Sequence, residues 1–307
     1  KETDEFLVGI KRSDEIIEIG TFSQGLQPQE KKLLIDTIVK NQKNDSLEFI
    51  RIEPGICMEL TFRSMESGCL NEPAFVSFRF DLSWEECTWD RLVLINTSIN
   101  KGLKLTNLDK ILWEDPLIPK EGLIAYLIQV STYMLPFLEQ RLLTIIRYPN
   151  GMKGESFYQK NCPDYAPDFI RKVEREGIQF IVCEDLSTLV WLGNQSAIEY
   201  HVPFQRFDDD RPLEIVFDLD PPDRSRFDLA VKAASEMKKI FDGFDITSFP
   251  KLSGSKGIQI HIPISDSRFT YSETRLFTSF ISDYLVKQFP DDFTVERLKR
   301  NRGGRLY

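Results

Sequence analysis

The sequence predicts a two-domain α+β protein, with a small β-barrel over residues 1–92, a linker over residues 93–104 and a mixed domain over residues 105–307. Short alternating strands with a single helix predict the barrel. A strand, an amphipathic helix and a second strand in succession predict the mixed domain. The linker is polar and contains Asn96, Thr97, Ser98 and Asn100. With 307 residues, 41% of them hydrophobic, the chain is long enough to bury two cores.

The first domain is predicted from four short stretches in which apolar and polar residues alternate. These strands are expected at residues 6–10, 16–22, 56–63 and 74–80. One helix is expected at residues 28–43, with an apolar stripe formed by Leu33, Leu34, Thr37 and Ile38. Short strands with one helix suit a small barrel of the OB type.

The most informative stretch of the second domain is a predicted strand over residues 214–218, which continues through Leu219 to Asp220. Because side chains alternate along a strand, Asp218 and Asp220 are expected on one face and Leu219 on the other. Two carboxylates that close repel each other unless a cation lies between them, and hard divalent cations prefer oxygen ligands. The pattern indicates a metal site for phosphoryl transfer, with a solvated strand end carrying two surface acids as the alternative.

A helix and a glycine-rich turn follow this strand. The helix is expected at residues 225–244, with an apolar face formed by Phe227, Val231, Ala234, Met237 and Phe241. The turn, residues 253–257, leads into an alternating strand at residues 258–263. Small residues can present backbone N–H groups to phosphate and Lys256 adds a charge, although the spacing of a Walker A loop is absent. The turn is therefore either part of a nucleotide site or a plain hairpin turn.

Five groups of short motifs occur in a characteristic order. The first of them reads Leu-Thr-Asn-Leu-Asp-Lys. The five groups are residues 105–110, 147–151 with 157–161, 189–194 with 199–203, 218–221 and 253–257. In these motifs the chain from residue 105 onward resembles the primase-type polymerase domain of bacterial ligase D, a multifunctional DNA end-joining protein. The resemblance implies an archaeo-eukaryotic-primase-like fold and a nucleotidyltransferase. Its reaction would be template-guided addition of a nucleotide, preferably a ribonucleotide, to a 3′-hydroxyl at a broken DNA end.

The resemblance also implies roles for the residues of the predicted nucleotide site. Asp218 and Asp220 would be the catalytic pair and would hold Mn²⁺ or Mg²⁺. Ser253 and Lys256 would contact the triphosphate of the nucleoside triphosphate substrate. Gln259 stands where the family commonly has a histidine, and it can still hydrogen-bond to phosphate without carrying a charge.

Four further residues acquire roles in the same way. His201 would contact the incoming nucleotide, the alternative being a core histidine bonded to a backbone carbonyl. Lys110 and Lys120 match positions that grip the 5′-phosphate at a DNA gap, the alternative being ordinary solvated lysines. Phe157 would stack on a template base or else belong to the core.

The N-terminal region resembles the C-terminal OB domain of ATP-dependent DNA ligases at residues 20–25, 57–60 and 75–79. The chain has no Lys-x-Asp-Gly motif, whose lysine forms the enzyme–adenylate in ligases. It is therefore not expected to seal nicks alone, although its parent protein is expected to ligate DNA with ATP. A rival description treats the parent as a DNA ligase of which this chain holds the OB domain and a processing domain.

One departure from the polymerase pattern concerns the metal site. The family's third metal-binding aspartate follows a basic, glycine-bearing turn, which matches residues 301–305 here, and it would be expected two residues after Tyr307. The sequence, which starts at Lys1, is therefore expected to be a fragment of a longer protein. A non-catalytic module that binds DNA ends remains the alternative function, because the third aspartate is absent from this chain.

Composition bears on location and partners. The five cysteines include no C-x-x-C pair, which argues against zinc sites and a disulfide framework and favours a reduced compartment. We expect no membrane partner, because no apolar run of about 18 residues is apparent, and a place in the bacterial cytoplasm, on the nucleoid when DNA is bound. The net charge of −9 predicts modest, salt-sensitive DNA affinity, so recruitment by the end-binding protein Ku is expected from the resemblance.

Overall fold

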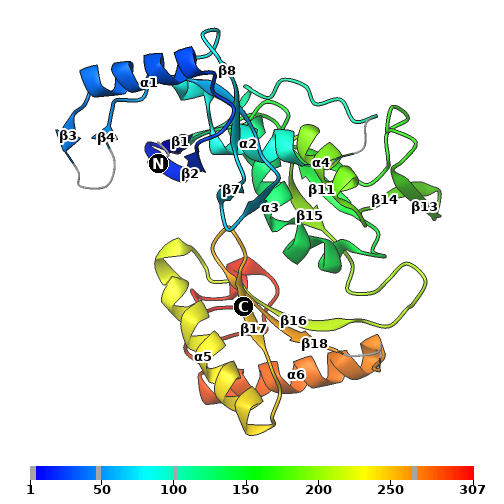
Figure 1. Cartoon of the computed structure of the whole chain (residues 1–307). Coiled ribbons are helices and arrows are strands. Elements are labelled where there is room, and N and C mark those ends of the chain that lie inside the picture. The colour runs from blue at the N-terminus through cyan, green and yellow to red at the C-terminus, as the bar shows by residue number, and fades with distance from the viewer. Residues whose placement is uncertain (1–4, 46–49, 98, 100–101, 265–267) are drawn as a thin grey trace. The chain divides into compact units, whose positions relative to one another are not determined.

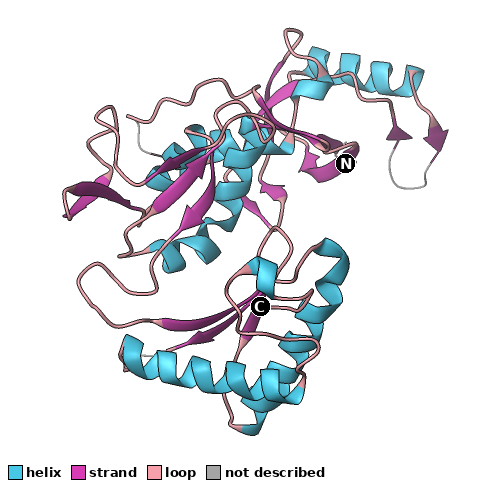
Figure 2. Ribbon diagram, turned by 180° about the vertical axis from the view of Figure 1, so that it is seen from behind, coloured by secondary structure: helices cyan, strands magenta, loops and turns pink. Residues whose placement is uncertain are grey.

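The computed structural model describes residues 5–45, 50–97, 99, 102–264 and 268–307. Helices and short antiparallel strands are mixed along the chain, which confirms the predicted α+β class (Figure 1, Figure 2). The chain divides into two compact units, which are described separately below. The first unit comprises Lys1–Ser131, Pro149–Gly154 and Leu189–Ser196, and the second comprises Thr132–Tyr148, Glu155–Thr188 and Ala197–Tyr307.

The N-terminal part of the first unit contains the four predicted strands and the predicted helix. Its elements are β1 (Phe6–Arg12), β2 (Glu15–Phe22), α1 (Pro28–Lys40), β3 (Asn44–Asp45), β4 (Ile50–Arg51), β5 (Met58–Thr61), β6 (Ser64–Glu66), β7 (Cys69–Asn71), β8 (Ala74–Phe78) and η1 (Trp84–Glu86). Helix α1 begins at Pro28, directly after the N-cap residue Gln27, and Gln27 and Glu30 form a capping box around its first turn. Its Leu34 packs with Phe6, Phe22 and Phe75 in a small core.

The strands of this region are paired two by two. The pairs are β1–β2, β3–β4, β5–β8 and β6–β7, all antiparallel. Over the described residues these ladders do not join into a closed barrel, so only the α+β character of the predicted OB-type domain is confirmed. Most of these strands have two to five residues, so each ladder is short.

The predicted linker overlaps a helix. Helix α2 (Trp89–Asn96) begins at the Thr88 cap and runs through residues 93–96. Its Trp89 and Val93 pack against Ala125 in a second core of the first unit. Ser98 and Asn100 of the predicted linker lie outside the described residues. The start of the linker is thus helical, because its apolar residues are used for packing.

The remaining elements of the first unit surround the start of a long helix. They are β9 (Ile111–Glu114), β10 (Leu117–Pro119), α3 (Lys120–Leu138), which continues into the second unit, and the end of α4 (Leu186–Asn194). Gly193 allows close packing of α4 on α3, since a Cβ there would lie 2.6 Å from Leu127 Cδ1. By length and composition α3 would qualify as a membrane span, although no apolar run of that length was predicted from the sequence. The same two criteria are met by helices of packed cores, and 33% of this apolar window is buried, including Ile124 and Ala125.

The second unit contains two three-stranded sheets and a hairpin. The first sheet has the order β12–β11–β15, the hairpin is β13–β14, and the second sheet has the order β16–β18–β17. The elements are β11 (Thr144–Arg147), β12 (Phe157–Gln159), β13 (Arg171–Arg175), β14 (Ile178–Val182), β15 (Ala197–His201), β16 (Glu214–Leu219), η2 (Arg224–Arg226), α5 (Phe227–Gly243), β17 (Phe249–Leu252), β18 (Ile258–Pro263), α6 (Tyr271–Gln288) and η4 (Lys299–Asn301).

Helices α5 and α6 pack with one face of the β16–β18–β17 sheet (Figure 1). That face carries Phe217 and Leu219 of β16 and the three isoleucines of β18, at residues 258, 260 and 262. Helix α5 buries Leu229, Ala230, Ala233, Met237 and Phe241 there. The prediction that Val231 belongs to this apolar face is wrong, because Val231 is exposed. The buried face is instead centred on Ala230 and Ala233, and Val231 lies about 100° around the helix from Ala230.

Candidate active site

The two predicted acidic residues lie where β16 ends. Asp218 is exposed and Leu219 is buried, so the two neighbours point to opposite faces as predicted. The register places Asp218 opposite Gln259 of β18, on the sheet face away from the core formed with α5 and α6. Asp218 forms no ion pair with any described residue. Its carboxylate is therefore available to a ligand from solvent.

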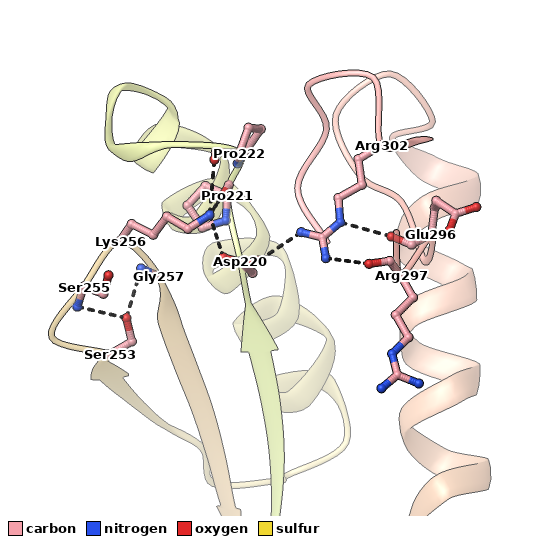
Figure 3. Close-up of polar contacts among 10 residues, drawn as sticks. All are labelled: Asp220, Pro221, Pro222, Ser253, Ser255, Lys256, Gly257, Glu296, Arg297 and Arg302. Carbon is pink, nitrogen blue, oxygen red and sulfur yellow. Dashed lines mark hydrogen bonds and ion pairs between the residues drawn. The ribbon is translucent and has the colours of Figure 1, made fainter. Parts of the chain in front are cut away.

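Asp220 differs from Asp218 because two cationic side chains bind it (Figure 3). Lys256 Nζ lies 2.8 Å from one carboxylate oxygen, and an Arg302 guanidinium nitrogen lies 2.9 Å from the other. Lys256 also donates to the backbone carbonyls of Pro221 and Pro222. Burial acts to raise the pKa of Asp220, but the hydrogen bonds from Lys256 and Arg302 outweigh it and hold that pKa below its ordinary value.

Arg302 was not predicted as a site residue. Arg302 is 6% exposed, and its guanidinium also donates to the backbone carbonyls of Glu296 at 3.1 Å and Arg297 at 3.0 Å. It lies over the ring of Tyr307, with 4.4 Å between the guanidinium carbon and the ring centroid. The only sequence signal was its place in a run of basic residues, in which Arg297 and Arg300 are exposed. The run consists of Arg297, Lys299, Arg300, Arg302 and Arg305.

The glycine-rich turn between β17 and β18 brings two predicted residues, Ser253 and Lys256, to the same end of the sheet. Ser253 Oγ accepts a hydrogen bond from the backbone N–H of Gly257 at 3.1 Å, and Lys256 extends from this turn to Asp220 (Figure 3). A side chain at Gly257 is excluded, because a Cβ there would lie 2.5 Å from the carbonyl oxygen of Leu219. Gln259 follows on β18. Asp218, Asp220, Ser253, Lys256 and Gln259 thus meet at one end of one sheet.

His201 and Phe157 lie on the other sheet of the same unit. His201 ends β15 opposite Thr144 of β11, and its Nε2 lies 3.0 Å from a carboxylate oxygen of Glu199. Because its side chain is 53% exposed and bonded to a carboxylate, the alternative of a core histidine is wrong. Phe157 of β12 is 50% exposed, so it is not a core residue either. A cavity of about 330 Å³ beside this sheet is lined by residues that include Thr144, Tyr158, Lys160, Arg175, Phe180 and His201.

Lys110 and Lys120 come together in the first unit. The backbone N–H of Lys120 donates to the carbonyl of Lys110 at 2.8 Å, which joins the start of α3 to the preceding loop. The ammonium of Lys110 is bonded to Asn150 Oδ1 at 3.2 Å, and that of Lys120 to the backbone carbonyl of Asn194 at 3.2 Å. Neither lysine forms a salt bridge with a residue in the described part of the chain.

The two lysines differ in burial. Lys120 is only 3% exposed, which rules out the alternative of an ordinary solvated lysine, whereas Lys110 is half-buried. Burial, and then the charge of Lys110, lower the pKa of Lys120. Asn150 and Asn194, which hold these two ammonium groups, were not predicted, although both lie within motifs of the sequence.

The donor set at the acidic end of the sheet suits a hard cation in type but is small in number. Asp218 and Asp220 supply carboxylate oxygens, the ligands that Mg²⁺ and Mn²⁺ prefer. Among the described residues, no group of three or more His, Cys, Asp or Glu side chains could hold a metal ion. A cation at Asp220 would compete with Lys256 and Arg302 for the same oxygens.

Comparison with known proteins identifies the family. Residues 119–307 match the model of the LigD primase–polymerase domain. The chain is 45% identical over 300 residues to the bifunctional non-homologous end joining protein LigD of Bacillus subtilis, covering 98% of this chain and 49% of that protein. It is 26% identical over 212 residues to the multifunctional LigD of Mycolicibacterium smegmatis, covering 67% of this chain and 28% of that protein. The chain thus spans half or less of the length of these relatives.

A solved structure shares the fold. It is the polymerase domain of Mycobacterium tuberculosis ligase D in complex with DNA, which superposes with a TM-score of 0.62 at 24% identity. The match covers 67% of this chain and 76% of that one. Together with the family match over residues 119–307, these relatives show that the chain belongs to the LigD primase–polymerase family of non-homologous end joining proteins.

Proposed function

We propose that the chain catalyses template-guided addition of a nucleotide, preferably a ribonucleotide, at broken DNA ends. The observation that carries the proposal is the meeting of Asp218 and Asp220 with Ser253, Lys256 and Gln259 at one end of a sheet. Asp218 and Asp220 act as metal ligands, and the turn binds the triphosphate. To bind an incoming phosphate, Lys256 would leave the Asp220 carboxylate and pair with the phosphate instead.

Mn²⁺ or Mg²⁺ fits the oxygen donors of Asp218 and Asp220 and would neutralise phosphate charge and activate the 3′-hydroxyl. A third ligand is proposed in a longer chain. Tyr307 and Asp220 exchange two backbone hydrogen bonds, of 2.8 and 3.2 Å, the pattern of an antiparallel pair. A residue two positions beyond Tyr307 would consequently face Asp218, on the same side of the sheet.

The DNA side of the proposal rests on the lysines of the first unit. Lys110 and Lys120 bind the 5′-phosphate at a gap, a role favoured by two ammonium groups without a carboxylate partner among the described residues. A phosphate dianion compensates both charges, which gives Lys120 a reason to be buried. His201 contacts the nucleotide and the exposed ring of Phe157 stacks on a template base.

The remaining assignments concern the parent protein. We propose that residues 1–92 form a ligase-type OB domain, residues 93–104 a linker and residues 105–307 the polymerase domain. The parent would also ligate DNA with ATP, act in the bacterial cytoplasm and be recruited to DNA ends by Ku. The 45% identity to the Bacillus subtilis bifunctional protein over nearly the whole chain supports the pairing of the two activities. We propose that α3 is a core helix and that no membrane is a partner.

The second candidate is a non-catalytic module that binds DNA ends. It is favoured by one observation, that the described residues offer two carboxylates at the site rather than three. The two candidates differ in what Asp218 does, because a binding module does not need a metal-binding acid.

Replacement of Asp218 by Ala tests the choice. Addition of a nucleotide to gapped DNA is measured with Mn²⁺, beside DNA binding by fluorescence anisotropy. We expect addition to be lost and DNA affinity to be unchanged. Asp283→Asn, which changes an exposed acid on α6, is the matched control and should retain full addition. Addition that survives Asp218→Ala would show that the metal assignment is wrong.

A further inference from the structure

Asn194, the last residue of α4, connects three parts of the lysine site. Its side chain is almost fully buried, with 7% of the residue exposed. Its Oδ1 accepts a hydrogen bond from the backbone N–H of Thr106 at 3.0 Å, and its Nδ2 donates to the carbonyl of Lys104 at 3.1 Å. One amide thus satisfies a backbone donor and a backbone acceptor of the segment that leads to Lys110. Without this amide, the two backbone groups would have to pair with water or with other protein groups.

The backbone of Asn194 acts on the other lysine. Its carbonyl accepts a hydrogen bond from Lys120 Nζ at 3.2 Å. An ammonium group has three N–H donors, and this bond uses one of them. The bond orients the side chain, but the carbonyl is neutral and does not compensate the charge. Lys120 in turn donates its backbone N–H to the carbonyl of Lys110. Asn194 therefore fixes the approach to Lys110 with its side chain and the ammonium of Lys120 with its main chain.

The position of Asn194 is set by packing rather than by the loop itself. The preceding residue, Gly193, lies against Leu127 and Ile124 of α3, where a side chain would collide. The end of α4 is thus held close to the helix that begins with Lys120. Two lysines of like charge repel each other, so holding them near one another requires rigid supports of this kind.

We infer that Asn194 is a positioning residue for the site that binds a phosphate monoester at a DNA 5′-end. The inference rests on the proposed role of Lys110 and Lys120. Asn194 does not touch the phosphate; it presets the two ammonium groups so that little ordering is needed when the phosphate arrives. Its loss should weaken recognition of the 5′-phosphate and leave the rest of DNA binding unaffected.

The test measures the affinity of the chain for two gapped duplexes that differ only in a 5′-phosphate or a 5′-hydroxyl at the gap. The readout is the dissociation constant of the hydroxyl duplex divided by that of the phosphate duplex, both obtained by fluorescence anisotropy. Asn194→Ala should lower this ratio on the order of tenfold, as expected for two lost hydrogen bonds, with an unchanged affinity for the hydroxyl duplex. Asn41→Ala, which removes an exposed amide bonded to Thr37 at the end of α1, should keep the wild-type ratio.

Asn194→Asp serves as a second variant because the two side chains have the same shape. It keeps the acceptor for Thr106, loses the donor to Lys104 and adds a negative charge near Lys120. We expect its ratio to fall at least as far as that of Asn194→Ala, and it decides the question if the alanine variant does not fold. Wild-type ratios in folded Asn194 variants would overturn the inference while leaving the lysine assignment intact. A wild-type protein without preference for the phosphate would overturn both.

Discussion

Asp220 and Lys120 are both charged side chains held largely out of water, and their environments compensate that charge in opposite ways. Asp220 is bound by two cations, Lys256 and Arg302. Lys120 has a backbone carbonyl as its partner and a second lysine nearby. A carboxylate that is already paired can bind a metal ion only by releasing its partners, whereas an unpaired buried ammonium gains from any anion that reaches it. A metal ion at Asp220 would therefore have to displace Lys256 or Arg302, whereas an anion at Lys120 would displace no carboxylate.

The largest effect is expected at the unpaired lysine. Lys120→Met should remove the preference for a 5′-phosphate at a DNA gap by about 10- to 100-fold, because a charge-assisted hydrogen bond contributes about 1.5–3 kcal/mol. Stability should not fall, since an apolar side chain replaces a buried charge. Binding to phosphorylated and hydroxylated gaps is compared by anisotropy. Lys238→Met, at an exposed lysine paired with Asp242, is the control. An unchanged preference in Lys120→Met would show that the buried ammonium group does not bind the 5′-phosphate.

Arg302 tests the paired carboxylate. Arg302→Met leaves Asp220 with Lys256 alone and removes the donor from two backbone carbonyls, so we expect a loss of about 2–4 kcal/mol in the free energy of unfolding. Urea denaturation provides the measurement. Arg297→Met removes an exposed guanidinium of the same basic run and should cost little. Equal stability of the two variants would mean that Asp220 does not depend on Arg302.

Gly193 tests the support of the lysine site. Gly193→Ala should lower the free energy of unfolding by about 1–2 kcal/mol, because the added Cβ meets Leu127 at 2.6 Å. Gly243→Ala is the matched change at the end of α5, where nothing lies within 4 Å of the added atom. It should be neutral or stabilising. Equal stability of Gly193→Ala and the control in urea denaturation would show that close packing of α4 on α3 does not depend on Gly193.

The smallest effect is expected from a second paired acid, Glu214. Burial acts to raise its pKa, but hydrogen bonds from Arg141 and His261 hold that pKa below its ordinary value. The folded state therefore binds the proton less tightly than the unfolded state. The resulting stability is present above the ordinary carboxyl pKa and is lost as the pH falls through the pKa of the folded state.

Glu214→Gln should consequently reduce the loss of stability between neutral and acidic pH. The free energy of unfolding is measured by urea at several pH values. Glu236→Gln, at a glutamate paired with Lys239 on the surface of α5, should leave the pH dependence unchanged. An identical slope in wild type and Glu214→Gln would show that this ion pair does not contribute.

Local patterns in the sequence predicted the elements that carry the site. Strand β16, helix α5 and the turn into β18 follow from alternation, helical spacing and glycines, all of which act over a few residues. The alternation also gave the correct faces of Asp218 and Leu219. Such patterns extend to the predicted N-terminal strands but not to their pairing, which depends on distant partners.

Contacts between residues far apart in the sequence could not be predicted from it. Arg302 meets Asp220 across 82 residues, and Asn194 meets Thr106 across 88. Nothing in the basic run distinguishes Arg302 from its exposed neighbours, because burial is decided by packing. The apolar character of α3 was likewise missed, since Lys120 and Glu121 at its start and polar residues within it obscure a long apolar segment.

The central claim is nucleotide addition at a DNA gap, and one experiment tests it most directly. Single-nucleotide addition is measured on gapped DNA with a downstream 5′-phosphate, Mn²⁺ and ribonucleotides, using this chain and a version extended beyond Tyr307. We expect both chains to add a nucleotide and the extended chain to be faster, because a residue two positions beyond Tyr307 would face Asp218 and could serve as the proposed third ligand. Absence of addition by both chains, with DNA binding intact, would contradict the polymerase assignment and favour the end-binding module.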